Sequence, residues 1–380
     1  MSWEKIKLED LCTSITDGDH QSLPLTDTGI PFIVIANINN VNRIDFEKAR
    51  YVPYEYYEKL DFKRKPEKGD VLLTVKGSFG IPVYVDTDKP FVFQRDIAIF
   101  KCNEKTNPMF LFYYMKNRSF YLYADSIAIG SAQRALTLKV LKNTIIAVPN
   151  LDEQNKIVAL LAPYDSLIKN NLEQIKLLEE AAKRLYKEWF IDLRFPGYED
   201  VKIVGGVPEG WEKVNLDIIA PILTGKKDAN FGTDDGAYPF FTCAQEPIKA
   251  PSYSFDCDAV ILAGNGDFNV KLYRGQFEAY QRTYVFSPKD PENLYLLYYA
   301  VKDSMRQLFQ GASGSTIKFL TKRMLVEILV FVPTNEIKEQ FNAVCESYQR
   351  KIEALKLQIQ FATEARDRLL PKLMSGKLEV

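Results

Sequence analysis

The 380-residue sequence contains a single histidine, His20. A Ser-His-Asp or Cys-His mechanism would have to use this residue, and no second histidine is present to build a metal site with it. His20 lies in the polar segment Asp17-Gly-Asp-His-Gln-Ser22, which predicts a surface loop. The scarcity of histidine argues against hydrolytic or metal-dependent catalysis.

Cysteine is also sparse. An odd number of cysteines without close pairs argues against a disulfide framework or a CxxC metal knuckle and predicts free thiols in a reducing cytoplasm. The five are Cys12, Cys102, Cys243, Cys257 and Cys345. Eighteen consecutive apolar residues occur nowhere, and the N-terminus MSWEKIKLEDL has no apolar signal core. We therefore expect a cytoplasmic protein without a membrane helix.

Motifs for nucleotides and cofactors are missing as well. Gly225-Lys226-Lys227 lacks the upstream glycine of a phosphate loop, and Gly264-Asn-Gly266 is not a dinucleotide-binding GxGxxG. The Asn-Pro-Pro-Tyr type of tetrapeptide that marks amino-methyltransferases is missing too. We expect a chain that has no catalytic residues and binds neither metal nor cofactor.

Positive charge is not in excess. The formal net charge is −1 and the pI is near 6.1, whereas a dedicated DNA-binding domain more often has a high pI. Any basic surface must therefore be local or shared with a partner. Hydrophobic residues at 46% suffice for more than one core, and the length favours two or three domains.

The most informative feature is an internal repeat of about half the chain. Six signals recur in the same order, and the shift between copies falls from 208 to 184 residues, so the second copy is shorter by 24. The matches are Trp3-Glu-Lys5 with Trp211-Glu-Lys213, Gly69–Leu73 with Asp256–Leu262, Gln94-Arg95 with Gln281-Arg282, Gly130-Ser131 with Gly314-Ser315, Leu136-Thr137 with Leu320-Thr321, and Val148-Pro149 with Val332-Pro333. This order predicts two related domains.

Each copy opens with a mixed domain. Buried strands are expected at 31–35, 71–75 and 91–93, separated by turn-forming residues, and short aromatic helices at 110–116 and 294–305. Residues 207–333 repeat this pattern.

Each copy ends in a long predicted helix with a heptad seam. The first seam, in 152–193, alternates spacings of four and three and has one polar member, Asn171: Ile157, Leu161, Tyr164, Ile168, Asn171, Ile175, Leu178, Ala182, Leu185 and Trp189. The second has one register slip near Ile352: Phe341, Val344, Tyr348, Ile352, Leu355, Ile359, Ala362, Arg366, Leu369 and Leu373. Each helix could pack on its own domain, but seams longer than a typical globular helix favour an intramolecular antiparallel coiled coil.

The predicted fold is therefore α/β (mixed α+β), a pseudo-two-fold dumbbell of two similar globular domains separated by two long helices. We expect a first domain at 1–150, a first helical spacer at 151–195, a turn-rich linker and second domain at 196–333, and a second spacer at 334–380.

This arrangement resembles the specificity (S) subunit of Type I restriction-modification systems. The resemblance spans essentially the whole chain. It rests on residues 3–8 that open the first copy, the strand and glycine turn of 69–80, the exit from Gly130-Ser131 to Asp152-Glu-Gln154, and the spacer ends at 183–190 and 369–376.

The resemblance implies a DNA-binding protein without catalytic activity. Each target-recognition domain would read one half of a bipartite site in double-stranded DNA through the groove edges, and the spacers would set the separation of the halves. Two modification (methyltransferase) subunits would dock on the spacers, and restriction (ATP-dependent endonuclease) subunits would join where present, so that the complex supports DNA methylation and DNA restriction.

The candidate DNA-binding residues are polar side chains in turn-rich positions shared by the copies. Arginines could pair with guanine, glutamine or asparagine with adenine, and lysines with phosphate. In the first domain they are Asp19, His20, Gln21, Lys76, Ser78, Gln94, Arg95, Ser131, Gln133 and Arg134, and in the second Thr224, Lys226, Lys227, Asn265, Asp267, Gln281, Arg282, Ser313, Ser315, Thr316 and Lys318. The loops 17–50 and 226–256 could carry further specificity.

Two other functions fit the same pattern. One is a specificity subunit for another class of restriction-methylation enzyme. The other is a protein-only coiled-coil scaffold or adaptor, which the near-neutral charge favours.

Overall fold

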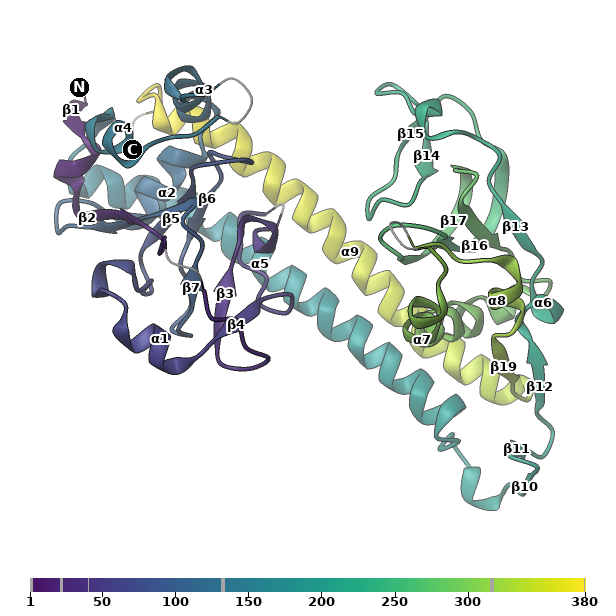
Figure 1. The fold of residues 1–380 in the computed structure, drawn as a ribbon. Coiled ribbons are helices and arrows are strands. Elements are labelled where there is room, and N and C mark those ends of the chain that lie inside the picture. The colour runs from purple at the N-terminus through teal and green to yellow at the C-terminus, as the bar shows by residue number, and fades with distance from the viewer. Residues whose placement is uncertain (1–2, 21–22, 40, 131–133, 315–317, 379) are drawn as a thin grey trace. The chain divides into compact units, whose positions relative to one another are not determined.

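The computed structural model describes residues 3–20, 23–39, 41–130, 134–314, 318–378 and 380. Its contacts divide the chain into two compact units (Figure 1). The first unit is Met1–Asn170 with Gln358–Val380, and the second is Asn171–Leu357. Each unit therefore contains one globular domain and one end of each long helix.

In the first unit, strands form three antiparallel or mixed sheets. A pair joins β1 (Glu4–Lys7) to β9 (Ile145–Val148). The main sheet has the order β2 (Cys12–Asp17), β8 (Ile97–Cys102), β5 (Val71–Thr74) and β6 (Pro82–Tyr84), and the third β4 (Arg50–Val52), β3 (Ile30–Ile33) and β7 (Val92–Phe93). The strands predicted at 31–35, 71–75 and 91–93 are all present.

The helices of the first domain are short. They are α1 (Tyr54–Lys59), α2 (Pro108–Lys116), α3 (Arg118–Ile127) and α4 (Leu138–Asn143). Helix α2 begins where Asn107 Oδ1 accepts hydrogen bonds from the amides of Met109 and Phe110, at 2.9 and 3.3 Å, with Pro108 in the first turn. The predicted helix 110–116 is thereby confirmed.

In the second unit the same strand order appears in a single larger sheet. The terminal pair is β12 (Glu212–Asn215) with β19 (Leu329–Val332). The six-stranded sheet has the order β13 (Ile222–Thr224), β18 (Thr283–Phe286), β16 (Phe255–Ala263), β17 (Val270–Ala279), β14 (Tyr238–Phe241) and β15 (Ile248–Ala250). The unbroken β17 occupies the places of both β6 and β7, which is why one sheet here replaces two in the first unit.

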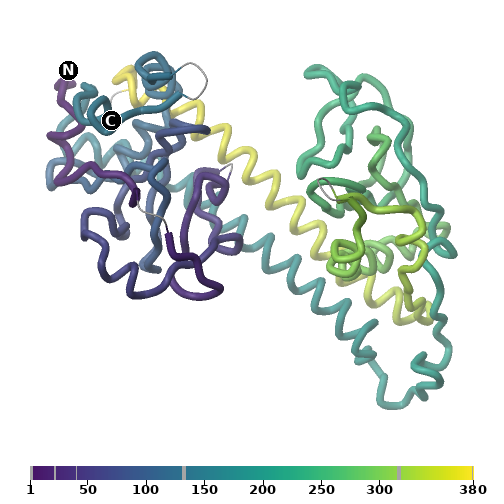
Figure 2. The backbone as a smooth tube through the Cα atoms, in the orientation of Figure 1, coloured from purple at the N-terminus to yellow at the C-terminus, as the bar shows by residue number. Residues whose placement is uncertain are grey.

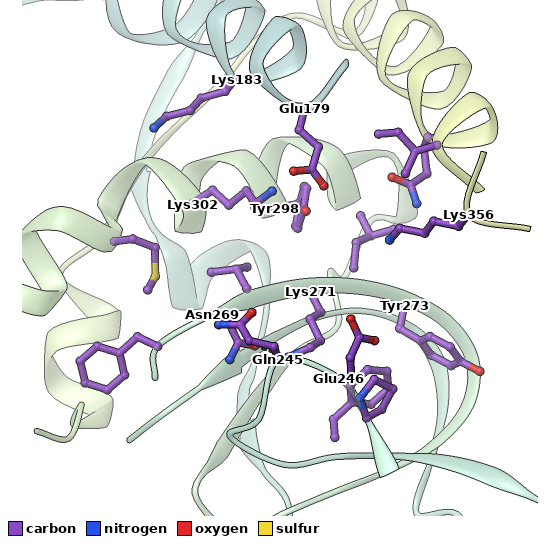
Figure 3. Close-up of a pocket in the computed structure, with 18 of the residues that line it drawn as sticks. Glu179, Lys183, Gln245, Glu246, Asn269, Lys271, Tyr273, Tyr298, Lys302 and Lys356 are labelled. Carbon is purple, nitrogen blue, oxygen red and sulfur yellow. Dashed lines mark hydrogen bonds between the residues drawn. The ribbon is translucent and has the colours of Figure 1, made fainter. Parts of the chain in front are cut away.

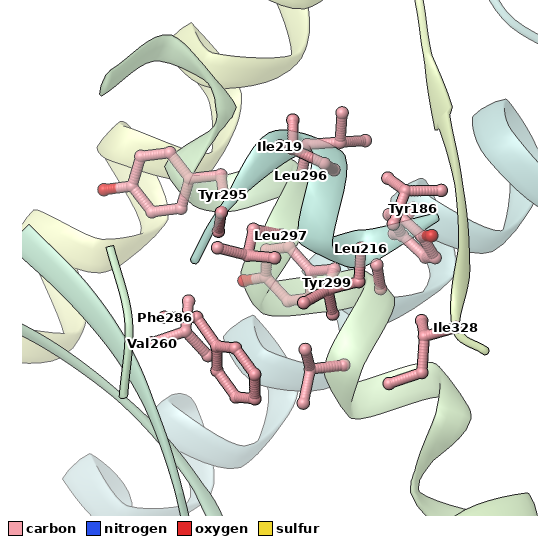
Figure 4. Close-up of a cluster of buried hydrophobic side chains, with 14 of the residues drawn as sticks. Tyr186, Leu216, Ile219, Val260, Phe286, Tyr295, Leu296, Leu297, Tyr299 and Ile328 are labelled. Atoms are coloured by element: carbon pink, nitrogen blue, oxygen red, sulfur yellow. The ribbon is translucent and has the colours of Figure 1, made fainter. Parts of the chain in front are cut away.

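The second domain carries α6 (Leu216–Ile219), α7 (Leu294–Gly311) and α8 (Lys322–Val326). Tyr295, Leu297 and Tyr299 of α7 pack into the main hydrophobic cluster of this unit, together with Val260 and Phe286 of the sheet (Figure 4). The aromatic helix predicted at 294–305 is therefore confirmed and extends to Gly311.

Most of the length difference between the domains lies between β3 and β5. Ile33 corresponds to Phe241, and Val71 to Val260, so the shift between copies falls from 208 to 189 in this stretch. The first domain uses the extra residues for α1 and the helical turn Phe62–Arg64.

The two long helices are α5 (Leu151–Tyr186), which continues as a π-helical turn through Ile191, and α9 (Asn335–Met374). Every residue of both predicted seams is buried or half-buried. Figure 2 shows the chain leaving α5 and passing through the hairpin β10 (Ile203–Val204) and β11 (Val207–Pro208), within the linker, before it enters β12.

Within each unit the two helices run antiparallel, as predicted for a coiled coil. In the first unit, Ile157 and Leu161 of α5 share a core with Leu373 near the end of α9. In the second, Tyr186 at the end of α5 lies 6.4 Å, between ring centroids, from Phe341 near the start of α9. The apolar seams thus bury both helices against each other and against the domains.

Candidate nucleic-acid interface

The candidate residues gather at one end of the main sheet in each domain. In the first domain this end, which we call the first edge, comprises residues 17–20, 74–80, 94–97 and 134–136. Backbone hydrogen bonds join its loops: Gly18 N to Ile97 O at 3.3 Å, Val75 N to Asp96 O at 2.8 Å, and Leu136 N to Val75 O at 2.8 Å. Residues distant in sequence are thereby held side by side.

The second domain has the same construction. Its second edge comprises residues 224–227, 263–268, 280–283 and 318–320. The equivalent bonds are Gly225 N to Thr283 O at 3.1 Å, Gly264 N to Arg282 O at 2.8 Å, and Leu320 N to Gly264 O at 2.8 Å. The repeat seen in the sequence is therefore a repeat of this hydrogen-bonded edge.

Glycines at matched positions make the edges possible. A Cβ on Gly18 would lie 2.3 Å from the carbonyl oxygen of Phe93, and one on Gly225 would lie 2.0 Å from that of Ala279. Both distances are far shorter than any real contact, so the loop can approach the neighbouring strand only without a side chain. Gly77 and Gly266, with φ of +70° and +68°, turn the chain after β5 and β16.

One match made from sequence is shifted by one residue. Ile97 N donates to Gln94 O as Thr283 N donates to Tyr280 O, which aligns Gln94 with Tyr280 and Arg95 with Gln281. The match of Gln94-Arg95 with Gln281-Arg282 is therefore wrong, because the dipeptides agree in letters but not in hydrogen-bond register. Arg282 instead occupies the place of Asp96.

Several candidate side chains are already engaged within the protein. Asp19 accepts hydrogen bonds from Tyr56 Oη at 2.7 Å and Arg64 Nη1 at 3.3 Å, and His20 Nε2 lies 2.9 Å from Asp17 Oδ2. Arg134 forms an ion pair with Asp125 at 3.2 Å. These contacts shape the first edge.

Similar internal contacts occupy candidates of the second edge. Gln281 Nε2 donates to Asp228 Oδ1 at 2.6 Å, and Asp267 accepts from Gln245. Lys227 and Lys318 lie over the rings of Phe231 and Phe309, at 4.3 and 4.0 Å from the ring centroids. A cation on an aromatic face keeps its charge and can still meet an anion.

Four basic candidates make no side-chain hydrogen bond or ion pair with any described residue. These are Lys76 and Arg95 on the first edge and Lys226 and Arg282 on the second. Lys76 is half-buried and the other three are exposed. A cation with no internal partner is available to an external anion, so each edge offers two such groups in a protein whose net charge is −1.

The remaining candidates have the following places. Gln94 lies in the first edge beside Asp19, Ser78 O accepts from Thr74 Oγ1 at 2.7 Å, and Thr224 is exposed at the end of β13. Asn265 and Ser313 both pair through the backbone with Phe319. Gln21, Ser131, Gln133, Ser315 and Thr316 lie outside the described residues.

The first edge is supported from behind by residues that are not among the candidates. Tyr56 of α1 and Arg64 both bind Asp19, and Thr16 Oγ1 donates to the carbonyl of Lys63 at 2.9 Å. Burial and the hydrogen bond to Asp19 raise the pKa of Tyr56 above its ordinary value. Tyr56, Lys63 and Arg64 lie in the stretch without a counterpart in the second domain, so the repeat could not reveal them.

The second unit also contains a cavity of about 870 Å³ that borders the second edge at Phe268 (Figure 3). Lysines and glutamates line it from α5, β17, α7 and α9, among them Glu179, Lys271 and Lys302. Burial lowers the pKa of Lys271, whereas Tyr298 and Glu179 outweigh the burial of Lys302 and raise its pKa. The lining thus mixes both signs of charge.

Among the described residues, no group of three or more His, Cys, Asp or Glu side chains is arranged to hold a metal ion. No described helix is both long enough and apolar enough to cross a membrane.

A family model for the Type I restriction modification DNA specificity domain matches residues 1–180 and 208–361. The chain belongs to this family. The two matched segments correspond to the two copies of the repeat. Membership in the specificity family implies DNA recognition as the function of this chain.

Curated relatives of the specificity family agree. The chain is 34% identical over 178 residues to the Type I restriction enzyme EcoDI specificity subunit of Escherichia coli, a match that spans 46% of this chain and 40% of that subunit. It is 23% identical over 412 residues to the MjaIX specificity subunit of Methanocaldococcus jannaschii, a match that spans all of this chain and 94% of the relative.

The fold agrees as well. The S subunit of the Type I restriction-modification system from M. genitalium superposes with a TM-score of 0.59 at 16% identity, over 98% of this chain and 96% of that one. The mixed α/β architecture with two domains and two long helices is therefore the fold of this family.

Proposed function

We propose that each globular domain reads one half of a bipartite site in double-stranded DNA with its edge. The observation that carries this proposal is the repeated edge itself, the same hydrogen-bonded set of loops with different side chains in each copy. A constant backbone frame with variable polar and basic side chains suits a pair of readers for two different sequences.

The two half-sites should differ in sequence. The first edge is supported by Tyr56 and Arg64, and the second lacks both. Lys76 of the first domain corresponds to Asn265 of the second, and Asp96 corresponds to Arg282. Side chains of different charge and hydrogen-bonding capacity select different base edges.

The long helices then serve as spacers. On this proposal, residues 1–150 and 196–333 are the target-recognition domains with the linker, and 151–195 and 334–380 set the distance between the half-sites. Two methyltransferase subunits dock on the spacers and bind the methyl donor, and restriction subunits add ATP-dependent cleavage where they are present. The chain itself is a non-catalytic subunit that acts on DNA in the cytoplasm.

Phosphate contacts would come from the unpaired cations of each edge. Lys76 and Arg95, and Lys226 and Arg282, are the described candidates without internal partners. With only two such groups per edge and no net positive charge, the isolated chain should bind DNA weakly, and the methyltransferase subunits should supply further contacts.

The test is selection from a library of random duplexes by the complex of this chain with its cognate methyltransferase. The bound fraction should be enriched in two short defined sequences separated by a fixed number of unspecified base pairs. An assembled complex that binds DNA but enriches a single continuous sequence, or none, would refute the proposal. Enrichment of no sequence would favour the protein-only scaffold.

A further inference from the structure

Among the described residues, the cross-strand pair that borders each edge contains one large apolar side chain that is exposed. In the first domain this is Ile129, which is 60% exposed, and in the second it is Phe319, which is 38% exposed. Single exposed apolar residues are common on protein surfaces. What distinguishes these two is their position.

Ile129 and Phe319 belong to equivalent cross-strand pairs. Ile129 pairs antiparallel with Ala135, through two backbone hydrogen bonds of 2.9 Å. Ser313 pairs in the same way with Phe319, with bonds of 3.1 and 2.8 Å. The large residue is on the incoming strand in the first domain and on the outgoing strand in the second.

Directly opposed residues of an antiparallel pair place their side chains on the same face. Each domain therefore presents one large apolar group and one small group at the same point, although the two domains build it from opposite strands. Two unrelated positions thus provide the same surface property, as expected if that property is used.

The pair continues into the edge. Ala135 also pairs with Lys76, and Phe319 also pairs with Asn265. A ligand on the basic and polar side chains of either edge would consequently reach the apolar group in the next strand.

We propose that Ile129 and Phe319 each contact the 5-methyl group of a thymine in the half-site read by their domain. This inference rests on the proposed function. In the major groove, phosphates and most base edges are polar, and the thymine methyl is the apolar group that distinguishes one base pair from the others. Ile129 and Phe319 are specificity-determining residues for that base pair.

The test combines protein and DNA changes in binding measurements on the complex with its methyltransferase. Each thymine of the half-site is replaced in turn by deoxyuridine, which lacks only the methyl group. At one position the replacement should weaken DNA binding by the unaltered complex about fourfold, the effect of losing one buried methyl-sized group. For Ile129→Ala the same replacement should have no effect in the first half-site, and for Phe319→Ala none in the second.

Ile145→Ala and Leu329→Ala are the matched controls. These residues are 55% and 51% exposed, occupy equivalent positions at the starts of β9 and β19, and lie in other sheets. Complexes with these controls should remain as sensitive to deoxyuridine as the unaltered complex.

The inference is overturned if a half-site contains no thymine that responds to deoxyuridine, or if Ile129→Ala and Phe319→Ala respond as the controls do. If Ile129→Ala and Phe319→Ala weakened DNA binding equally on every sequence, the inference would also be overturned, because this would indicate contact with the partner subunit. Failure of the proposed function is distinct, since the unaltered complex would then select no split site.

Discussion

Arg366 of α9 donates a hydrogen bond from Nη1 to Oδ1 of Asp165 on α5, at 2.5 Å. Arg366 is 6% exposed and stands at an apolar position of the predicted seam. Asp165 also accepts from Tyr113 Oη at 2.6 Å, so a single carboxylate joins both helices to helix α2 of the first domain. The polar member of the second seam therefore links α9 to α5 and, through Asp165, to the first domain.

Removing one partner of the Arg366–Asp165 pair should destabilise the folded protein. Arg366→Met leaves the Asp165 carboxylate without its principal cation, and we expect a loss of about 3 kcal/mol in the free energy of unfolding. Arg350→Met on the same helix is the control, because Arg350 is 76% exposed in its pair with Glu346 and should cost about 0.5 kcal/mol or less. Denaturant unfolding of both variants makes the comparison. Equal losses would show that the buried pair has no special role.

The stability of the second unit should depend on the side chain of Phe341. This residue is fully buried and contacts Tyr186, Trp189, Phe190 and Tyr299, with a centroid distance of 4.8 Å to Phe190. Phe341→Ala should cost about 3–5 kcal/mol because it leaves a cavity among aromatic rings. Phe361→Ala, on the same helix but 58% exposed, should change stability by about 0.5 kcal/mol or less. A comparable effect of the two variants in thermal unfolding would contradict the assigned core.

Glu346 should contribute a pH-dependent part of the stability. Hydrogen bonds from Arg274 and Tyr295 lower its pKa from 4.5 to about 2. The folded state therefore favours the carboxylate, so the stabilisation is present above pH 4.5 and is lost as the pH falls towards 2. The group is partly exposed, so the loss should be on the order of 1 kcal/mol.

Unfolding of the unaltered chain and of Glu346→Gln at pH 7 and pH 3 measures this effect. The difference in the free energy of unfolding between the two chains should be smaller at pH 3 than at pH 7. Glu353→Gln, a substitution at an exposed site on the same helix, should show no such trend. A difference that stays constant with pH would mean that the carboxylate charge is not what stabilises this site.

The unpaired cations should supply phosphate contacts. For the complex with its methyltransferase, Arg282→Ala and Lys226→Ala should each reduce the slope of log affinity against log salt by about 0.9 if the residue neutralises one phosphate. Arg323→Ala, which removes an exposed cation paired with Glu327 outside the edge, should leave the slope unchanged. If Arg282 instead reads guanine, its loss should cost about 1–3 kcal/mol on one base pair only.

The repeat and the two long helices could be predicted from the sequence because their signals are strong. Gly130 and Gly314 occupy equivalent places in the hydrogen-bond ladder, as the sequence match indicated, and share a φ of +104°. Every residue of both heptad seams is buried or half-buried. A glycine at a backbone turn and a heptad pattern in a helix can each be recognised in the sequence of each copy separately.

The details of the edges could not be predicted in the same way. The match at Gln94 is wrong by one residue because both domains contain the dipeptide Gln-Arg. Only the strand pairing reveals that Gln94 corresponds to Tyr280. Tyr56 and Arg64 come from an insertion without a repeat partner, and the Ile129–Ala135 and Ser313–Phe319 pairs exchange their large and small members between strands. Such compensation across strands is visible only in three dimensions.

The most direct test of the central claim is base-resolution sequencing of methylated DNA from cells that co-express the chain with its cognate methyltransferase. A chimera in which residues 211–333 come from another member of the specificity family should be compared with the unaltered chain. The account predicts a split methylated motif in which the chimera changes one half and leaves the other half and the spacing intact. An active, assembled complex that methylates no split motif, or a chimera that alters both halves together, would contradict it.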